Sequence, residues 1–60
     1  MITVYLRGNT YGIKETLKGL GFRWSQSEKA WIGHFDTIEK AEEIATRWYK
    51  EGVYGQVITK

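Results

Sequence analysis

The sequence contains no cysteine and no proline among its 60 residues, and it has one histidine. Without cysteine the chain forms no disulfide, offers no zinc-ribbon spacing and carries no thiol nucleophile. Its longest uncharged apolar run is far shorter than the roughly 20 residues that a membrane span needs. We therefore expect a soluble, cytoplasmic protein with no linker, no membrane partner and no metal or other cofactor.

Aromatic residues are abundant instead, with three Trp, four Tyr and two Phe. Each buried aromatic removes about 150–250 Å² from water, so these side chains supply core volume that a short chain otherwise lacks. The length predicts one domain, residues 1–60. The formal net charge of +2 permits a polyanionic partner but does not require one.

The first half of the chain shows a strand pattern followed by a helix pattern. Residues 2–7 alternate between aliphatic and polar side chains, which predicts a half-buried strand with Tyr5 and Arg7 on the face away from the core. Ile13, Leu17 and Leu20 then recur at helical spacing. We expect this helix to be capped at Thr10 and ended by glycine at position 21.

The middle of the chain predicts a hairpin of strands 22–24 and 30–35 around a polar loop. In its second strand Trp31 and Phe35 share one side while Ile32 and His34 share the other, so the pattern leaves the buried face open. Large aromatic residues are usually buried. We accordingly place Trp24 and Trp48 in the core and leave Trp31 undecided.

The second half of the chain predicts a longer helix and a last strand. We expect Asp36 and Thr37 to cap this helix, with Glu39 at capping-box spacing from Asp36, and Gly52 to close it. Residues 53–59 are rich in β-branched and aromatic side chains and form a strand. The apolar stripe of the helix consists of Ile38, Ala41, Ile44, Ala45 and Trp48.

The resulting order is β-α-β-β-α-β, which predicts an α+β, ferredoxin-like fold with a four-stranded antiparallel sheet. Right-handed crossovers would place both helices on one face of that sheet and leave the other open. A different strand order in another small α+β arrangement is the alternative.

Catalytic motifs are missing. His34 has no cysteine, serine elbow or paired acidic cluster beside it in the sequence, and the segment Gly19-Leu20-Gly21 follows a helix rather than opening one. The acidic residues lack EF-hand spacing. We therefore expect no enzymatic activity, no catalytic residue and no metal site.

Aromatic and basic side chains on the strands favour nucleic-acid binding. Tyr5, Arg7, Arg23 and Lys29, together with either Trp31 or His34, form an outward set that would stack unpaired bases and contact phosphates. Lys14 and Lys18 of the first predicted helix add further positive charge. The predicted nucleic-acid-binding residues are Tyr5, Arg7, Lys14, Lys18, Arg23, Lys29 and Trp31.

The segment from Tyr11 to Trp31, with its Leu20-Gly21-Phe22-Arg23-Trp24 run and the later Lys29-Ala30-Trp31, resembles a small domain of phage and plasmid proteins whose role is mostly unassigned. A more distant likeness is to the HARP domain of annealing helicases. The sequence departs from the first pattern at Phe22 and Ser25. The resemblance implies a mobile-element origin and a nucleic-acid context, and it implies no catalytic residue.

Two functions follow as expectations. The first is a phage or mobile-element accessory protein that binds nucleic acid, preferably single-stranded DNA, through an open sheet face. The alternative is a phage-encoded inhibitor of a host defence or replication protein, in which Glu39, Glu42 and Glu43 mimic nucleic-acid charge. The chain is expected to be a monomer, or a homodimer paired through the edge of strand 53–58.

Overall fold

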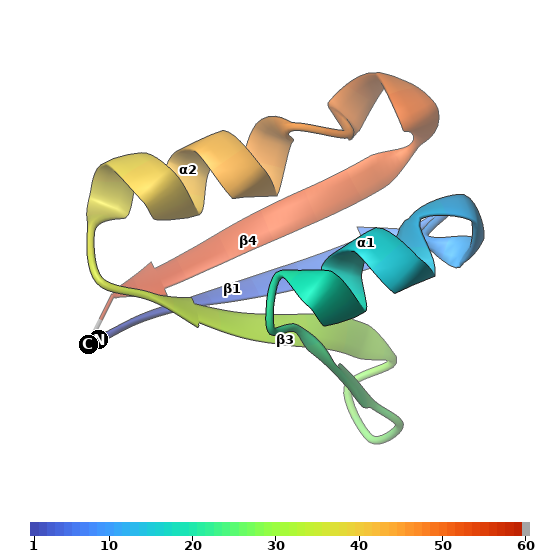
Figure 1. The fold of residues 1–60 in the computed structure, drawn as a ribbon, viewed down its shortest axis with the longest axis horizontal. Helices are drawn as coiled ribbons and strands as arrows, with labels where there is room; N and C mark the ends of the chain where they lie inside the picture. Colours follow the sequence, from blue (N-terminus) through green and yellow to red (C-terminus); the bar gives the residue numbers. More distant parts are fainter. Residues whose placement is uncertain (60) are drawn as a thin grey trace.

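The computed structural model describes residues 1–59 of the chain (Figure 1). These residues form four strands, two α-helices and two short 3-10 helices. In chain order the elements are β1 (Ile2–Gly8), η1 (Tyr11–Ile13), α1 (Lys14–Gly19), β2 (Arg23–Ser25), β3 (Ala30–Phe35), α2 (Ile38–Thr46), η2 (Tyr49–Glu51) and β4 (Val53–Thr59). Among them, no helix is long and apolar enough to cross a membrane.

The four strands form one antiparallel sheet in the order β2-β3-β1-β4. This is the ferredoxin-like arrangement, and it confirms the predicted fold class. β1 lies inside the sheet and pairs with both β3 and β4. Its first residue, Ile2, is opposite Thr59, so β1 begins where β4 ends (Figure 1).

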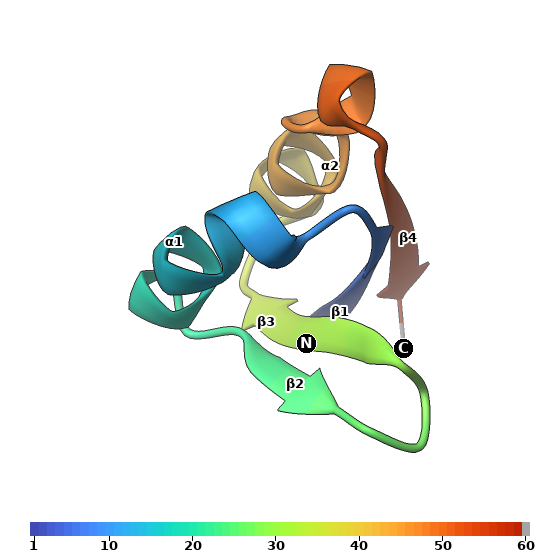
Figure 2. The ribbon, with the colours of Figure 1, turned by 90° about the vertical axis from the view of Figure 1, so that its right-hand side faces the viewer.

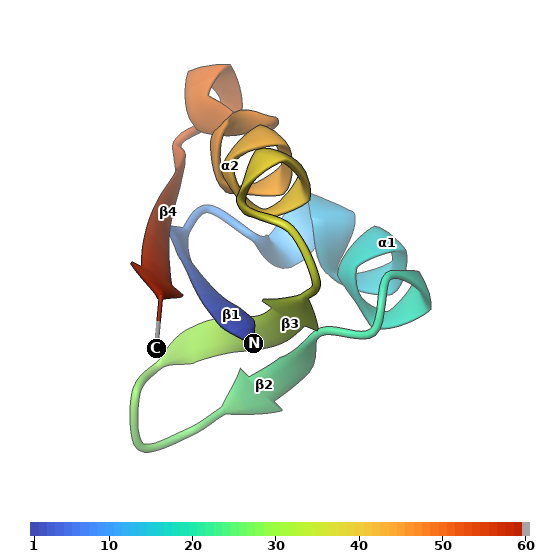
Figure 3. The same cartoon turned by 90° about the vertical axis from the view of Figure 1, so that its left-hand side faces the viewer.

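Both α-helices cover the same face of the sheet, and the other face carries no helix (Figures 2 and 3). The core lies between these layers. It contains the predicted aliphatic face of β1, Leu17 of α1 and the inner side of α2. Its fully or nearly buried members are Val4, Leu6, Leu17, Phe22, Trp31, Ala41, Ile44, Ala45 and Val53.

The pairing of β1 with β3 settles which face of β3 is buried. Trp31 is opposite Leu6 and Gly33 is opposite Val4, so Trp31 lies on the covered face. A Cβ atom at position 33 would lie 2.7 to 2.9 Å from ring atoms of Phe22. Glycine at this position therefore makes room for a buried ring above the centre of the sheet.

Close packing also joins α2 to β4. A Cβ atom at Gly55 would lie 2.6 Å from both Cα and Cβ of Ala45, and closer still to its carbonyl oxygen. Glycine on the strand and alanine on the helix thus let the two backbones approach each other.

The first helix differs from its prediction at both ends. It starts with the 3-10 turn η1, and Thr10 makes no side-chain capping bond. The Thr10 hydroxyl instead accepts a hydrogen bond of 3.2 Å from the buried Trp31 Nε1, so this side chain serves the core and not the helix end. Leu20 is 41% exposed, while Gly21 has the predicted left-handed backbone with φ of 96°.

The second helix is shorter than predicted, and only one of its two predicted capping residues caps it. Thr37, not Asp36, is the N-cap residue, and its Oγ1 accepts a hydrogen bond of 3.3 Å from the backbone N–H of Lys40. The helix ends at Thr46, whose hydroxyl donates to the carbonyl oxygen of Glu42. Thr46 is β-branched, and Trp48 and Tyr49 follow it; residues of these two kinds have low helix propensity, which favours an early end.

Trp24 is not a core residue. It is 48% exposed because β2 is a three-residue strand at the edge of the sheet, with no neighbour on its outer side. Trp48 is partly buried and packs against the core, close to its predicted position.

Candidate nucleic-acid interface

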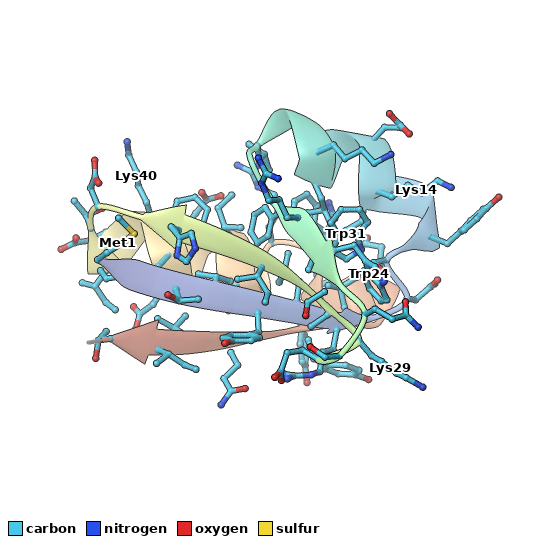
Figure 4. All side chains as sticks on the ribbon, turned by 90° about the horizontal axis from the view of Figure 1, so that it is seen from below. Met1, Lys14, Trp24, Lys29, Trp31 and Lys40 are labelled. Atoms are coloured by element: carbon cyan, nitrogen blue, oxygen red, sulfur yellow. The ribbon has the colours of Figure 1, made fainter. Side chains whose placement is uncertain are left out.

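The face of the sheet without helices carries a row of side chains that spans all four strands. Arg23 of β2 is opposite Ile32 of β3, Ile32 is opposite Tyr5 of β1, and Tyr5 is opposite Gln56 of β4. Residues directly opposite each other in a sheet project to the same side. We call this surface, with Arg7 and His34 on the same strands, the open face. Figure 4 views it with α2 behind the sheet.

Arg7 is held in place on the open face, beside Tyr5. Its guanidinium carbon lies 5.3 Å from the centroid of the Tyr5 ring, and Nη1 donates a hydrogen bond of 3.2 Å to Gln56 Oε1. Nη2 lies 3.7 Å from Glu28 Oε1, and the two side chains are 41% and 51% exposed. The guanidinium plane is therefore positioned by β1, β4 and the β2–β3 turn, yet it remains accessible to solvent.

The helices and turns carry charges of both signs, whereas the strands carry no acidic side chain. The basic side chains that the strands place on the open face are Arg7, Arg23 and His34. All seven acidic residues lie outside the strands, and Glu28 reaches the open face only through its contact with Arg7. The acidic residues are Glu15, Glu28, Asp36, Glu39, Glu42, Glu43 and Glu51.

Three of the predicted binding residues, Tyr5, Arg7 and Arg23, lie on the open face as expected. Lys29 is exposed in the turn between β2 and β3, and its backbone is left-handed with φ of 53°. A left-handed backbone costs a residue with a Cβ about 1 kcal/mol or more, and glycine avoids that cost. The turn thus holds a lysine at a position where glycine fits better.

The prediction that Trp31 is exposed on the open face is wrong. Trp31 is 7% exposed, lies beneath η1 and bonds to Thr10, because the ring fills the space between β3 and the start of the first helix. Its alternative on the strand, His34, takes the exposed position. The ring Nδ1 of His34 lies 3.2 Å from the Thr3 hydroxyl.

The lysines of the first helix do not lie on the open face, because α1 covers the opposite side of the sheet (Figure 2). The Lys14 ammonium lies 4.6 Å from the centroid of the Tyr11 ring. The Lys18 ammonium lies 3.7 Å from the Glu15 carboxylate. One ligand can therefore contact these two lysines and the open face together only if it passes from one side of the sheet to the other.

The sequence analysis missed the contribution of β4 and the exposure of Trp24. Gln56 was overlooked although it is a polar residue within an otherwise apolar strand, which was the available signal. The short length of the 22–24 segment was the signal for an edge strand, where a large side chain has few neighbours. Trp24 lies against Trp31 with ring centroids 5.6 Å apart.

Other features suit catalysis or small-molecule binding less well. Within residues 1–59, no group of three or more His, Cys, Asp or Glu side chains is arranged to hold a metal ion. A surface depression at the end of α2 is lined by residues of mixed charge. It consists of Thr46, Arg47, Tyr49, Lys50 and Glu51 and does not adjoin Tyr5 or Arg23 in the sheet.

Comparison of the chain with family models, with curated proteins and with solved structures found no match.

Proposed function

We propose that this chain is a non-enzymatic accessory protein that binds single-stranded nucleic acid, preferably DNA, on the open face. The observation that supports this most is that the strands carry basic side chains and no acidic ones. The uncovered face presents Arg7 and Arg23 around an aromatic residue, Tyr5, while the acidic residues lie on the helices and turns. The resemblance described above adds a phage or mobile-element context, and the host cytoplasm as the place of action.

Each residue has a distinct role in this proposal. Bases of a single strand stack on aromatic rings and on arginine guanidinium planes. Tyr5 and the guanidinium of Arg7 above it form such a platform. Arg7 also contacts a phosphate at the position that Glu28 now occupies, and Arg23 at the edge of the sheet and Lys29 in the adjoining turn contact two more. A single strand is preferred to a duplex because its bases expose their π faces.

The direct test is fluorescence anisotropy with a labelled oligothymidine of about 12 nucleotides, within the range that small single-strand-binding domains cover. Contacts from Arg7, Arg23 and Lys29 predict that log affinity falls with log salt with a slope of about 2, at about 0.7 per phosphate contact on a single strand. A titration with an oligouridine of equal length shows whether the protein prefers DNA or RNA. Absence of binding at low salt would remove the proposal.

Two variants separate stacking from charge. Arg23→Gln should weaken binding and lower the salt slope by about 0.7, because one phosphate contact is lost. Tyr5→Val should weaken binding by about 5-fold to 150-fold, which corresponds to about 1–3 kcal/mol for one stacked base, and leave the slope unchanged. Lys40→Gln, on the exposed surface of α2, is the control with the same charge change as Arg23→Gln.

The alternative, an inhibitor of a host protein, would use the acidic surface of α2. Basic side chains partly neutralise that surface. Arg47 Nη2 lies 2.8 Å from Glu43 Oε2, and Lys40 lies between the other glutamates in the sequence. If the oligonucleotides do not bind, loss of host-protein binding in a Glu39→Lys, Glu42→Lys double variant would support this function instead.

A further inference from the structure

Trp24 has the features of a preorganised contact residue. The side chain is 48% exposed, yet two contacts fix its orientation. The ring packs edge-on against the buried Trp31 at 5.6 Å between centroids, and Nε1 donates a hydrogen bond of 3.1 Å to Gln26 Oε1. A fixed aromatic ring loses little conformational freedom when a ligand stacks on it.

The position of Trp24 connects it to the open face. Arg23 and Trp24 are consecutive residues of β2, so their side chains project to opposite faces of the sheet. Because β2 is an edge strand, no further strand separates the two faces at this point. A flexible ligand that leaves the open face beside Arg23 can therefore pass around the edge of β2 and reach Trp24.

Basic and aromatic residues continue beyond Trp24. Trp31, which supports Trp24, is bonded to Thr10 directly before η1. Tyr11 follows and is 79% exposed, with Lys14 stacked over its ring. Figure 4 shows Trp24 and Lys14 toward the same end of the molecule, on the side where α1 begins.

One acidic residue, Glu15, lies on this part of the helix. Its ion pair with Lys18 has 3.7 Å between the charged atoms, and both side chains are mostly exposed. Exposed pairs of this kind contribute little to stability, so a phosphate can replace the carboxylate as the partner of Lys18. The local charge thus suits a polyanion.

We propose that Trp24 is a second stacking position, at which single-stranded nucleic acid bound on the open face passes around the β2 edge and places one base on the indole. Lys14 then lies near the following phosphates. The proposal rests on the function proposed above. It also accounts for the predicted lysines of α1, which belong to the same ligand path although they lie on the other side of the sheet.

The test compares variants of the full chain in the anisotropy assay. Trp24→Leu should weaken binding of the oligothymidine of about 12 nucleotides by about 5-fold or more, whereas Trp24→Phe should retain most of the affinity. Tyr49→Leu removes an aromatic side chain that is 65% exposed on η2, and it serves as the control. Circular dichroism verifies that each variant is folded.

A second measurement does not depend on removing the stacking interaction. Trp31 is buried and Trp48 is partly buried, so the tryptophan fluorescence that a ligand quenches should come mainly from Trp24. The oligonucleotide should quench the natural protein, and Trp24→Phe should lose this quenching while it still binds. An oligonucleotide of about four nucleotides, at the lower end of known site sizes, should occupy the open face alone and be indifferent to Trp24→Leu.

The outcomes separate the two proposals. If Trp24→Leu binds as tightly as Tyr49→Leu while Arg23→Gln and Tyr5→Val bind weakly, the open face is the binding site and the role of Trp24 is wrong. Quenching that persists in Trp24→Phe would contradict the role of Trp24 in the same way. If the natural protein binds no oligonucleotide, both proposals are wrong.

Discussion

Arg7 connects three parts of the molecule through one side chain. It lies over Tyr5, donates to Gln56 and forms an ion pair with Glu28. The first two contacts hold the guanidinium beside the Tyr5 ring on the open face. The third is a solvent-exposed pair in which Glu28 occupies the position that a phosphate would take in the proposed complex.

We therefore predict that Glu28→Gln increases affinity for the oligonucleotide by about 1.4-fold to 5-fold at low salt, because exposed ion pairs contribute about 0.2–1 kcal/mol. The measurement is the anisotropy titration. Glu39→Gln on α2 removes the same charge far from Arg7 in the sequence and is the control. An equal increase in both variants would mean that net charge alone, and not competition for Arg7, sets the affinity.

The hydrogen bond from Trp31 to Thr10 has a structural consequence that is independent of function. It provides a hydrogen-bond acceptor for Nε1, the one polar atom of the buried Trp31 side chain. We expect Thr10→Val, which keeps the shape but removes the hydroxyl, to lower the free energy of unfolding by about 1–3 kcal/mol, the cost of an unpaired buried donor. Urea denaturation measures this loss. Thr10→Ser retains a hydroxyl and should lose distinctly less; equal losses would contradict the role of the bond.

At the scale of elements, the contact between α2 and β4 tolerates no additional atom. Gly55→Ala would place a methyl group against the backbone of Ala45, so we expect it to lower the free energy of unfolding by about 1–3 kcal/mol. Gly19→Ala is the matched control. It lies in α1 with no atom within 4 Å of the added Cβ, and it should increase stability by up to about 1 kcal/mol. In thermal unfolding, we expect Gly55→Ala to lower the melting temperature and Gly19→Ala to raise it.

The elements also show what the sequence could predict. The regular alternation in 2–7 was sufficient to identify the buried face of β1, and with it the outward positions of Tyr5 and Arg7. In β3 Trp31 and Phe35 face one side and Ile32 faces the other, so both faces carry large hydrophobic side chains and alternation had no preferred phase. That choice depends on Phe22, whose ring occupies the space above Gly33 and so orients β3 with Trp31 inward.

The ends of the helices and the exposure of Trp24 depended on tertiary contacts. A threonine before an apolar helix is a good capping residue, but at Thr10 the hydroxyl is taken by a tryptophan 21 positions away in the sequence. Trp24 is hydrophobic enough for a core, yet the sheet ends at its strand. Neither fact follows from local periodicity, because both depend on which strands become neighbours.

At the scale of the whole molecule, the two edges of the sheet differ. β2 has three residues, whereas β4 has seven and pairs with β1 along its whole length. β4 contains no charged residue, and the chain has no proline, so two common protections against edge pairing are missing from it. Homodimerisation through residues 53–58, one of the two expected oligomeric states, remains consistent with this edge.

We predict that the protein associates with itself at high concentration through β4, which sedimentation equilibrium would detect. Tyr54→Lys places a charge on the edge strand and should keep the protein monomeric, because edge lysines oppose strand pairing. Tyr11→Lys adds the same charge on η1, far from β4 in the sheet order, and should associate like the natural protein. Association of Tyr54→Lys at the same concentration would rule out this edge.

The pairing of Ile2 with Thr59 affects how the chain reaches its fold. β1 is synthesised before the other three strands of the sheet, but one of its two neighbours, β4, is synthesised after them. The sheet is complete only after Ile2–Gly8 and Val53–Thr59 have met, and such distant contacts make folding slower than in helical proteins of equal size. Until β4 is synthesised, the backbone groups of β1 that pair with it have no partner. The partly synthesised chain therefore exposes the edge of a strand that later lies inside the sheet.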